Sequence, residues 1–334
     1  MNPVRVAVVG AGSFGRNHLR VLRQLDGVVV AGVTDTDPAR AEAAAAEFGC
    51  PVLREVTGAA DAAIVAVPTT AHAAATLPLL EAGLDVLVEK PIAHDLAAAR
   101  RMSEAAARRR RVLQVGHLER FNPAVEALAR AVTVPLFFEV HRLNVFSARS
   151  LDVDVVLDLM IHDLDIVLSM TRAMPTEIRA AGLAILTDRV DIANVRLAFA
   201  NGCIANFTAS RVSTERVRKL RLFQPSQYIS VDYQKQEAAV FSVSGEVPDK
   251  QIDFEMFTPP KMEPLRSELA AFIDCVRTRR PPRVGGDDGT RALEVSLAIL
   301  DNIEEHVRIV ASTLSSWRGG TRPRDLRNPE LPHA

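Results

Sequence analysis

The sequence predicts an α/β protein that begins with a doubly wound parallel sheet and continues into a second α/β part with an open, mostly antiparallel sheet. Three observations predict this fold class. Short apolar runs alternate with helical patterns as far as Gly116, strand-like runs then follow one another, and two helical patterns close the chain. Parallel strands need helical crossovers between them, whereas antiparallel strands can be joined by tight turns.

The first part contains the apolar runs Val4–Val9, Val28–Thr34, Ala62–Val67, Asp85–Val88 and Val112–Val115. Between these runs lie the helical patterns Phe14–Leu25, Pro38–Phe48, Ala71–Ala82 and Leu96–Arg109. Such mainly apolar runs, alternating with helical patterns, indicate strands buried on both faces of a parallel sheet. Crossovers between such strands are right-handed, so we expect helices on both faces.

The second part starts with a strand at Pro135–Val145 and a helix at Val153–Met170, for which Asp152 is a candidate N-cap. Asn201-Gly202 favours a type I′ hairpin turn. The other expected strands are Ala193–Ala200, Cys203–Arg211, Lys219–Phe223, Tyr228–Tyr233 and Ala238–Val243, and the closing helices are Ser267–Arg279 and Thr290–Ser312. We therefore expect domains over 1–120 and 121–314 and a loosely ordered tail over 315–334.

Composition excludes several classes of protein. The chain has 334 residues, 48% of them hydrophobic and 24% charged, and a net charge of −1, so no basic field indicates nucleic acid or a membrane surface. The run Arg108–Arg111 ends a predicted helix, where water solvates it. Cys50, Cys203 and Cys275 show no metal or disulfide spacing. We expect a cytoplasmic protein without a signal peptide, membrane span or metal site.

Gly10, Gly12 and Gly15 follow the first strand in G-x-G-x-x-G spacing and open a helix, together with Ser13 and Phe14. This context predicts a dinucleotide site in which Gly10 allows a tight turn, Gly12 lets a pyrophosphate approach, and Gly15 lets the helix pack closely on the sheet. The alternative is a glycine-rich turn with an ordinary helix cap.

Asp35 ends the second strand, where an acid would hydrogen-bond the adenosine ribose. A carboxylate at this place repels a 2′-phosphate, so we expect NAD rather than NADP. Arg40 is the residue that could instead pair with such a phosphate.

Two later strand ends carry polar side chains, and ligands of parallel sheets bind beyond these ends. Pro68, Thr69 and His72 follow one strand, and Glu89 and Lys90 follow another. We expect all five to contact the cofactor, with Lys90 beside the nicotinamide. Taken alone, a lysine at a strand end would more often be solvated.

The segment LDLMIHDLDI places Asp158, His162 and Asp165 within an arc of about 60° on one helix. Asp163 points to the opposite side and is expected to be solvated. A polar network between domains and a metal site are the alternatives. We favour an acid–base site, because histidine titrates near neutral pH and a neighbouring carboxylate can orient it.

Together, the glycine loop, VPTTAH, EKP and the D-x-x-x-H-x-x-D helix resemble the Gfo/Idh/MocA oxidoreductase family over nearly the whole chain. The resemblance implies a Rossmann domain, a second domain that binds substrate and forms homodimers or homotetramers, and NAD(P)-linked oxidation of a sugar or cyclitol hydroxyl. It places Lys90 and His162 in the active site, with Asp158 as the acid one turn earlier.

We therefore expect His162 to accept the substrate's hydroxyl proton, Lys90 to donate to the developing carbonyl oxygen, and Asp158 to position the pair. The sequence leaves open which of Lys90 and His162 is the principal base. The candidate substrate-binding residues beyond these three are Arg120, Asn122, Arg142, Asn144 and Arg211. An equally good interpretation is that Arg120 is a surface arginine and Asn122 is a helix cap.

GHLERFNPAV and DVVLDLMIHDLDIVLS resemble the branch of this family that oxidises UDP-N-acetylglucosamine at its 3-hydroxyl. In that branch the 3-keto product passes to an aminotransferase, and cationic side chains would suit the diphosphate. One alternative is a dehydrogenase of a free sugar or inositol. The alternative of another class is a non-catalytic NAD-binding sensor, which would lack the proton-transfer residues.

Overall fold

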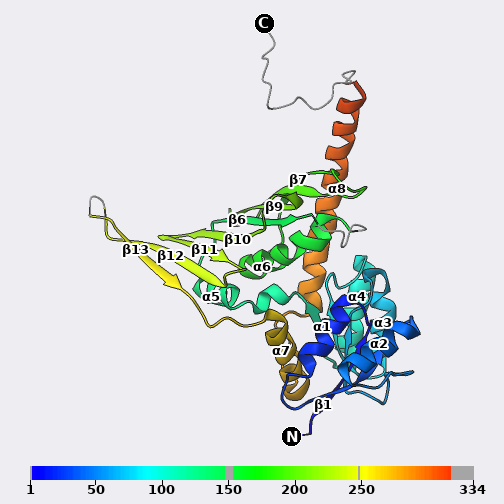
Figure 1. The fold of residues 1–334 in the computed structure, drawn as a ribbon. Helices are drawn as coiled ribbons and strands as arrows, with labels where there is room; N and C mark the ends of the chain where they lie inside the picture. Colours follow the sequence, from blue (N-terminus) through cyan, green and yellow to red (C-terminus); the bar gives the residue numbers. More distant parts are fainter. Residues whose placement is uncertain (1, 147–152, 247–248, 317–334) are drawn as a thin grey trace.

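The computed structural model describes residues 2–146, 153–246 and 249–316, and these residues form two sheets (Figure 1). The first sheet is entirely parallel and has the order β2-β1-β3-β4-β5. Its strands are β1 (Val4–Val9), β2 (Val28–Thr34), β3 (Ala62–Val65), β4 (Asp85–Glu89) and β5 (Leu113–Gly116). The order reverses direction beside β1, and the crevice at such a point is where ligands bind in open α/β sheets.

Helices cover both faces of this sheet, as the apolar runs predicted. They are α1 (Ser13–Leu22), α2 (Pro38–Phe48), α3 (His72–Glu81) and α4 (Leu96–Arg109). Neighbouring residues of β4 belong to different cores: Val86 and Val88 pack into one, and Leu87 packs into the other. The Asp37 side chain caps α2 by accepting the Ala39 and Arg40 N–H groups.

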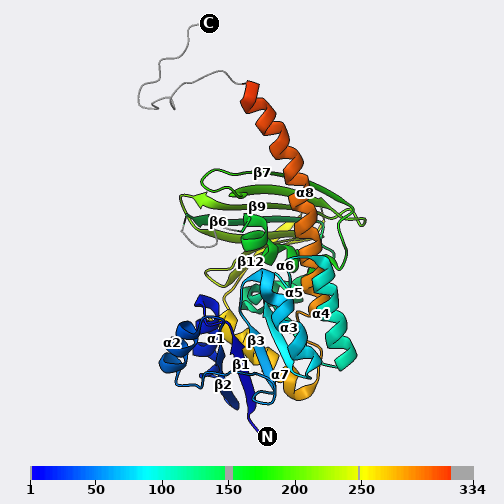
Figure 2. The ribbon, with the colours of Figure 1, turned by 90° about the vertical axis from the view of Figure 1, so that its right-hand side faces the viewer.

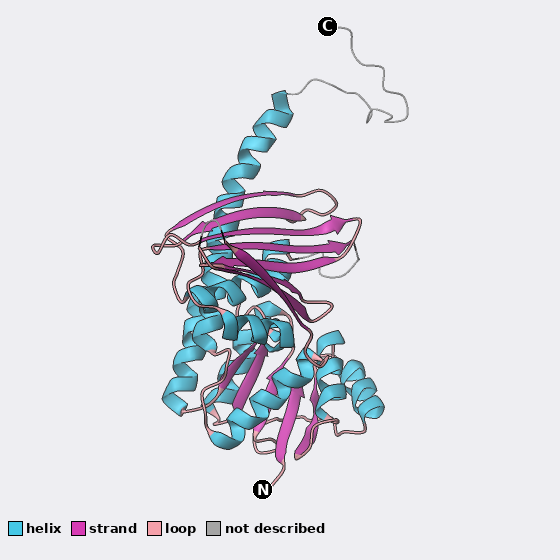
Figure 3. Ribbon diagram, turned by 90° about the vertical axis from the view of Figure 1, so that its left-hand side faces the viewer, coloured by secondary structure: helices cyan, strands magenta, loops and turns pink. Residues whose placement is uncertain are grey.

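The second sheet has eight strands in the order β13-β12-β11-β10-β6-β9-β8-β7, and only the β6–β9 pair is parallel among the described residues (Figure 3). The strands are β6 (Phe137–Val145), β7 (Glu177–Leu183), β8 (Ile192–Ala198), β9 (Ile204–Ser213), β10 (Val217–Gln224), β11 (Gln227–Asp232), β12 (Glu237–Ser244) and β13 (Gln251–Phe257). α5 (Pro123–Ala131) and α6 (Ile161–Thr171) pack on one face, so the predicted fold class is confirmed.

Some elements differ from the sequence-based expectation. β7, β13 and α5 were not among the elements predicted from the sequence. The turn between β8 and β9 is not type I′, because Gly202 is its only residue with positive φ, whereas type I′ needs positive φ at both central positions. The first turn of the predicted 153–170 helix is a π-helix, Val156–Met160, in which the Ile161 N–H bonds to the Val156 carbonyl.

Both helices near the end of the chain pack on the first sheet, and α8 continues along the second (Figure 2). α7 (Pro264–Thr278) returns to the first sheet and buries Leu269, Phe272 and Ile273 in its core. α8 (Gly286–Ser316) places Leu293 in a core of the first sheet and Ile299 in that of the second. The division after residue 120 remains a proposal, and it assigns α7, which packs with the first sheet, to the second domain.

Asp152 and residues 317–334 of the expected tail lie outside the described residues. Within the described part of the chain, no helix has the length and apolar character needed to cross a membrane.

Candidate active site

The glycine loop joins the end of β1 to α1, and two of its glycines have no room for a side chain. A Cβ on Gly15 would lie 1.8 Å from the Gly10 carbonyl oxygen, and one on Gly10 would lie 2.4 Å from the Ala66 oxygen. Gly12 differs, because no atom of the described residues lies within 4 Å of the place its Cβ would take. Gly10 and Gly15 thus pack closely against neighbouring backbone, whereas the space beside Gly12 is open.

That opening belongs to a groove of about 750 Å³ at the carboxyl ends of the first three strands. Of the residues predicted to bind the cofactor, those lining it are Gly10, Gly12, Ser13, Phe14, Asp35, Arg40 and Pro68. Gly15, Thr69, His72, Glu89 and Lys90 are not among the lining residues. The open space before Gly12 fits a pyrophosphate at the N-terminus of α1, so the groove suits a dinucleotide.

Asp35 fastens the glycine loop to the end of β2. One carboxylate oxygen accepts the Ala11 N–H at 2.7 Å and the other accepts the Asp37 N–H at 2.9 Å. Each oxygen has two lone pairs, so each can still accept a ribose hydroxyl. Arg40 is exposed and pairs with Asp37 at 3.1 Å.

His72 and Glu89 lie behind the groove and hold its loops in place. The His72 ring lies between two backbone carbonyls, with Nδ1 2.8 Å from the Pro91 oxygen and Nε2 3.0 Å from the Val67 oxygen. Burial lowers its pKa, and the neutral ring can donate to only one of these carbonyls. Glu89 is buried against His18, with 2.7 Å between Oε1 and Nε2.

The buried carboxyl of Glu268, on α7, escaped the sequence analysis. Neither of its oxygens has a hydrogen-bond partner among the described residues. Burial and the nearby Glu89 carboxylate raise the pKa of Glu268 well above the usual range, which favours its neutral form. The sequence pattern of this amphipathic helix gives no sign that Glu268 is buried. The packing of α7 on the first sheet creates the buried environment.

Lys90, at the end of a first-sheet strand, contacts Asp158, in the turn before α6. Lys90 follows β4, and its Nζ donates to the Asp158 backbone oxygen at 2.7 Å and to Oδ1 at 3.4 Å. Asp158 lies in the π-helical turn that leads into α6, and π-helical turns often occur at functional sites. His162 follows in the first turn of α6, and the Lys90 charge acts on its pKa. The structure therefore brings these three predicted residues together.

His117 is a further histidine here that the sequence analysis did not single out. Its ring packs edge to face on His162 with 5.9 Å between the centroids. It is 1% exposed, and neither of its ring nitrogens has a partner among the described residues. Burial lowers its pKa to about 3. The sequence signal that could have identified His117 is its place directly after β5, at the carboxyl end of a further parallel strand.

Burial also lowers the pKa of His162 well below its usual value, and the Lys90 and Arg142 charges lower it further. His162 is therefore neutral near pH 7 and ready to accept a proton.

If His162 is the base, the acid-side decline of kcat/KM should lie below pH 6.5, the unperturbed value for histidine. The neutral ring is the active form, and a lowered pKa keeps it neutral to a lower pH. The measurement is kcat/KM as a function of pH, with calorimetry of cofactor binding over the same range as the control. An acid limb centred above pH 6.5 with constant cofactor binding would contradict the assignment.

Asp163 is not solvated, so that expectation was wrong. It is 1% exposed and accepts two hydrogen bonds from Arg142, at 2.6 Å from Nε and 2.9 Å from Nη2. Arg142 also donates to Glu119 at 3.1 Å. The carboxylates raise the pKa of Arg142. Its guanidinium is buried and hydrogen-bonded to Asp163 and Glu119. Asp163 therefore points into the second domain, where β6 supplies its partner.

Other predicted substrate residues also contact their own chain. Asn122 is buried, accepts the Ala124 N–H at 3.1 Å and donates to the Tyr233 oxygen at 3.0 Å, so it acts as the cap of α5. Arg211 donates to the Val153 oxygen and lies 3.8 Å from Asp191. Arg120 pairs with the buried Asp165 at 3.3 Å.

Asn144 differs from these residues. Its Oδ1 is buried without a hydrogen-bond partner among the described residues, so that oxygen remains available to a ligand or water.

Arg218, at the start of β10, is a cation that the sequence analysis did not identify. Its positive charge is among those that lower the His162 pKa, which indicates that it lies near the site. Its side chain is 31% exposed, and its nearest carboxylate is Glu119 at 3.6 Å. Burial and the neighbouring Arg142 charge lower its own pKa, so an added anion would be favourable here.

Comparisons with known proteins give a consistent result. Residues 4–117 match a family model described as "Oxidoreductase family, NAD-binding Rossmann fold", and residues 134–225 match one described as "GFO/IDH/MocA C-terminal domain". The UDP-N-acetylglucosamine 3-dehydrogenase of Acidithiobacillus ferrooxidans is 34% identical over 90% of this chain and 97% of its own length. A solved structure of that enzyme superposes with a TM-score of 0.86, covering 92% of this chain and 100% of that one.

More distant relatives share the fold. An inositol 2-dehydrogenase of Rhizobium meliloti is 24% identical over 92% of this chain and 98% of its own length. An oxidoreductase from Agrobacterium radiobacter, solved in complex with NAD+, L-tartaric acid and magnesium, superposes with a TM-score of 0.81 at 16% identity. That alignment covers 91% of this chain and 97% of that one.

Proposed function

This chain belongs to the Gfo/Idh/MocA family of NAD(P)-dependent sugar dehydrogenases. From that premise we propose that it oxidises the 3-hydroxyl of a UDP-N-acetylhexosamine, most specifically UDP-N-acetylglucosamine, to a 3-keto sugar. The observation that carries the proposal of catalysis is the Lys90 ammonium held against Asp158 beside a neutral, buried His162. The 34% identical relative supports the choice of substrate.

In the proposed mechanism, His162 is the base and Lys90 is the hydrogen-bond donor. The neutral His162 ring accepts the proton of the 3-hydroxyl, and the Lys90 ammonium donates to the oxygen as it becomes a carbonyl. The Asp158 backbone oxygen, at 2.7 Å, orients that ammonium. When bound, the nicotinamide cofactor supplies the hydride acceptor. Burial of His117 against His162 limits the water that can reach the ring.

We propose NAD as the cofactor in preference to NADP. Asp35 lines the groove at the end of β2, where its charge repels a 2′-phosphate. Arg40 also lines the groove, but its guanidinium pairs with Asp37.

On the substrate side, we propose that Arg218 contacts the diphosphate. The predicted candidates Arg142 and Arg211 are buried against carboxylates of their own chain, whereas Arg218 is partly exposed and lies near His162. Arginine suits this role because its guanidinium can donate two parallel hydrogen bonds to phosphate oxygens.

The test follows reduction of NAD and NADP spectrophotometrically over UDP-sugars, free sugars and inositols. We expect turnover of UDP-N-acetylglucosamine with NAD. In Arg218→Ala, KM should rise at least tenfold while kcat stays within about threefold, and the exposed Arg196→Ala is the matched control. UDP alone should raise the melting temperature of the wild type. Turnover of a free sugar or inositol, with no effect of UDP, would contradict the proposed substrate.

Two alternatives remain distinguishable by the same test. The inositol 2-dehydrogenase relative favours a free cyclitol as the second candidate substrate. A non-catalytic NAD-binding sensor would bind NAD and turn over none of the panel. The proposed 3-keto product carries a carbonyl that an aminotransferase could convert to an amine, and we propose an enzyme of that class as the next step.

We also propose a homodimer or homotetramer formed through the open face of the second sheet. A row of aromatic side chains in contact with one another crosses its strands on the face opposite α6: Phe137, Phe223, Tyr228, Phe241 and Phe254. Phe254 is 57% exposed and Phe223 is 38% exposed. An exposed apolar patch of this kind commonly marks an interface.

A further inference from the structure

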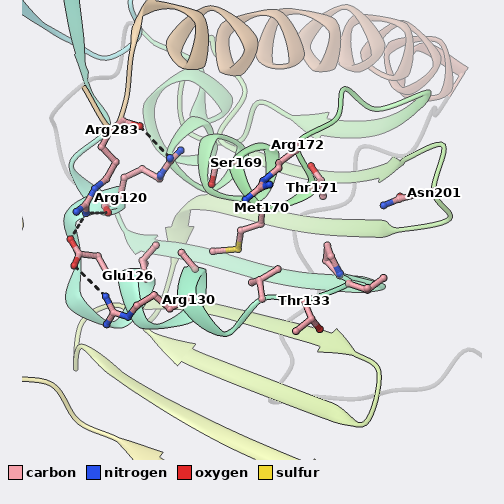
Figure 4. A pocket seen from close by; sticks show the side chains of 15 residues that line it. Arg120, Glu126, Arg130, Thr133, Ser169, Met170, Thr171, Arg172, Asn201 and Arg283 are labelled. Carbon is pink, nitrogen blue, oxygen red and sulfur yellow. Dashed lines mark hydrogen bonds and ion pairs between the residues drawn. The ribbon is translucent and has the colours of Figure 1, made fainter. Parts of the chain in front are cut away.

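A second cavity, separate from the cofactor groove, lies at the far end of α6 (Figure 4). It measures about 630 Å³, and its walls come from α5, the segment that follows it, the end of α6 and the turn at Asn201. His162 and Arg172 are ten residues apart along α6, which corresponds to about 15 Å. The Arg172 end of the cavity therefore lies about that far along the helix from the proposed base.

Positive charge dominates the wall of this cavity. Its lining includes Arg120, Arg130, Arg172 and Arg283 but only one acidic residue, Glu126. Two of the arginines have a close carboxylate partner: Arg120 pairs with Asp165 at 3.3 Å, and Arg283 pairs with Glu126. Arg283 also packs over the Phe121 ring.

The other two arginines lack a close carboxylate. The Arg172 guanidinium has no hydrogen bond or ion pair within the described part of the chain, and Figure 4 shows it at the cavity wall beside Ser169 and Thr171. The closest approach of Arg130 to a carboxylate is 4.0 Å, to the Glu126 that Arg283 already engages. Thr133, Thr171 and Asn201 add hydroxyl and amide groups to the lining.

We propose that this arginine pocket, defined by Arg120, Arg130, Arg172 and Arg283, binds a phosphate-bearing small molecule. Arg172, which has no ion pair among the described residues, and Arg130, whose only pair with a carboxylate there is 4.0 Å long, can attract a multivalent oxyanion in this concave site. Their planar guanidinium forks match phosphate oxygens. The hydroxyl and amide groups can complete its coordination. The volume lies within the range of about 300–1,000 Å³ that is usual for small-ligand sites.

Calorimetric titration of the full chain with pyrophosphate tests the proposal. Saturating NAD is present throughout, so that the glycine loop is occupied. The wild type is expected to bind, and Arg130→Glu combined with Arg172→Glu should weaken binding at least tenfold. Arg100→Glu combined with Arg101→Glu, on the exposed side of α4, is the charge-matched control and should bind like the wild type. Melting temperatures check that each variant is folded.

Arg218→Ala separates this pocket from the proposed substrate site. If Arg218→Ala binds pyrophosphate with wild-type affinity and the Arg130/Arg172 variant does not, the result supports the arginine pocket. This outcome does not depend on the identity of the substrate. No measurable binding to the wild type, or binding that only Arg218→Ala abolishes, would overturn it. Equal loss in the Arg100/Arg101 control would also overturn it, because net charge alone would then explain the effect.

Discussion

Replacing Lys90 or His162 with alanine is expected to lower kcat by about 10²- to 10⁴-fold, the usual contribution of a positioned proton-transfer group. His162→Ala removes the proposed base, and Lys90→Ala removes the donor that Asp158 orients. The two losses should not add fully, because both side chains act on the same oxygen. Initial rates with saturating NAD and UDP-N-acetylglucosamine measure the effect.

Two controls separate lost chemistry from lost structure. NAD affinity and melting temperature should remain near wild type, because the groove is lined by other residues. The Lys90→Arg variant keeps the charge but not the geometry, so it should stay impaired. If both alanine variants kept kcat within about threefold of wild type, the proposed roles of Lys90 and His162 would be untenable.

Replacing Arg142 with methionine is expected to lower the free energy of unfolding by about 3–5 kcal/mol, the usual cost of removing one partner of a buried ion pair. The Asp163 carboxylate would lose two hydrogen bonds in a site where it is 1% exposed. Adding Asp163→Leu should restore part of the loss, because Asp163 then no longer carries an unpaired buried charge, whereas Glu119 still lacks the Arg142 hydrogen bond. Urea unfolding of the single and double variants gives the comparison.

The matched control is the half-exposed pair between Arg221 and Glu139, whose atoms are 2.8 Å apart. Arg221→Ala should cost less than about 1 kcal/mol, because water screens this pair. A loss for Arg142→Met as small as that for Arg221→Ala would show that Asp163 is solvated after all.

Local signals were sufficient for most of the first sheet. The predicted runs Val4–Val9 and Val28–Thr34 coincide with β1 and β2, and the predicted helices Pro38–Phe48 and Leu96–Arg109 coincide with α2 and α4. Local sequence sets the bounds of these elements, because mainly apolar runs form the buried strands and Asp37 and Asp95 cap the helices. β13 was missed although QIDFEMF alternates polar and apolar residues at the period of a strand, and its side chains are mostly exposed.

The sequence by itself determined the α/β class, the glycine loop and the family, since each depends on residue types at short, regular spacing. Only the tertiary structure decided which polar residues remain available to a ligand. Arg142 and Asp163 lie on separate elements and bury each other, and Arg218 reaches the site from a distant strand. Helical periodicity gives the direction of a side chain around its own axis, whereas the packing of the two sheets determines what lies in that direction.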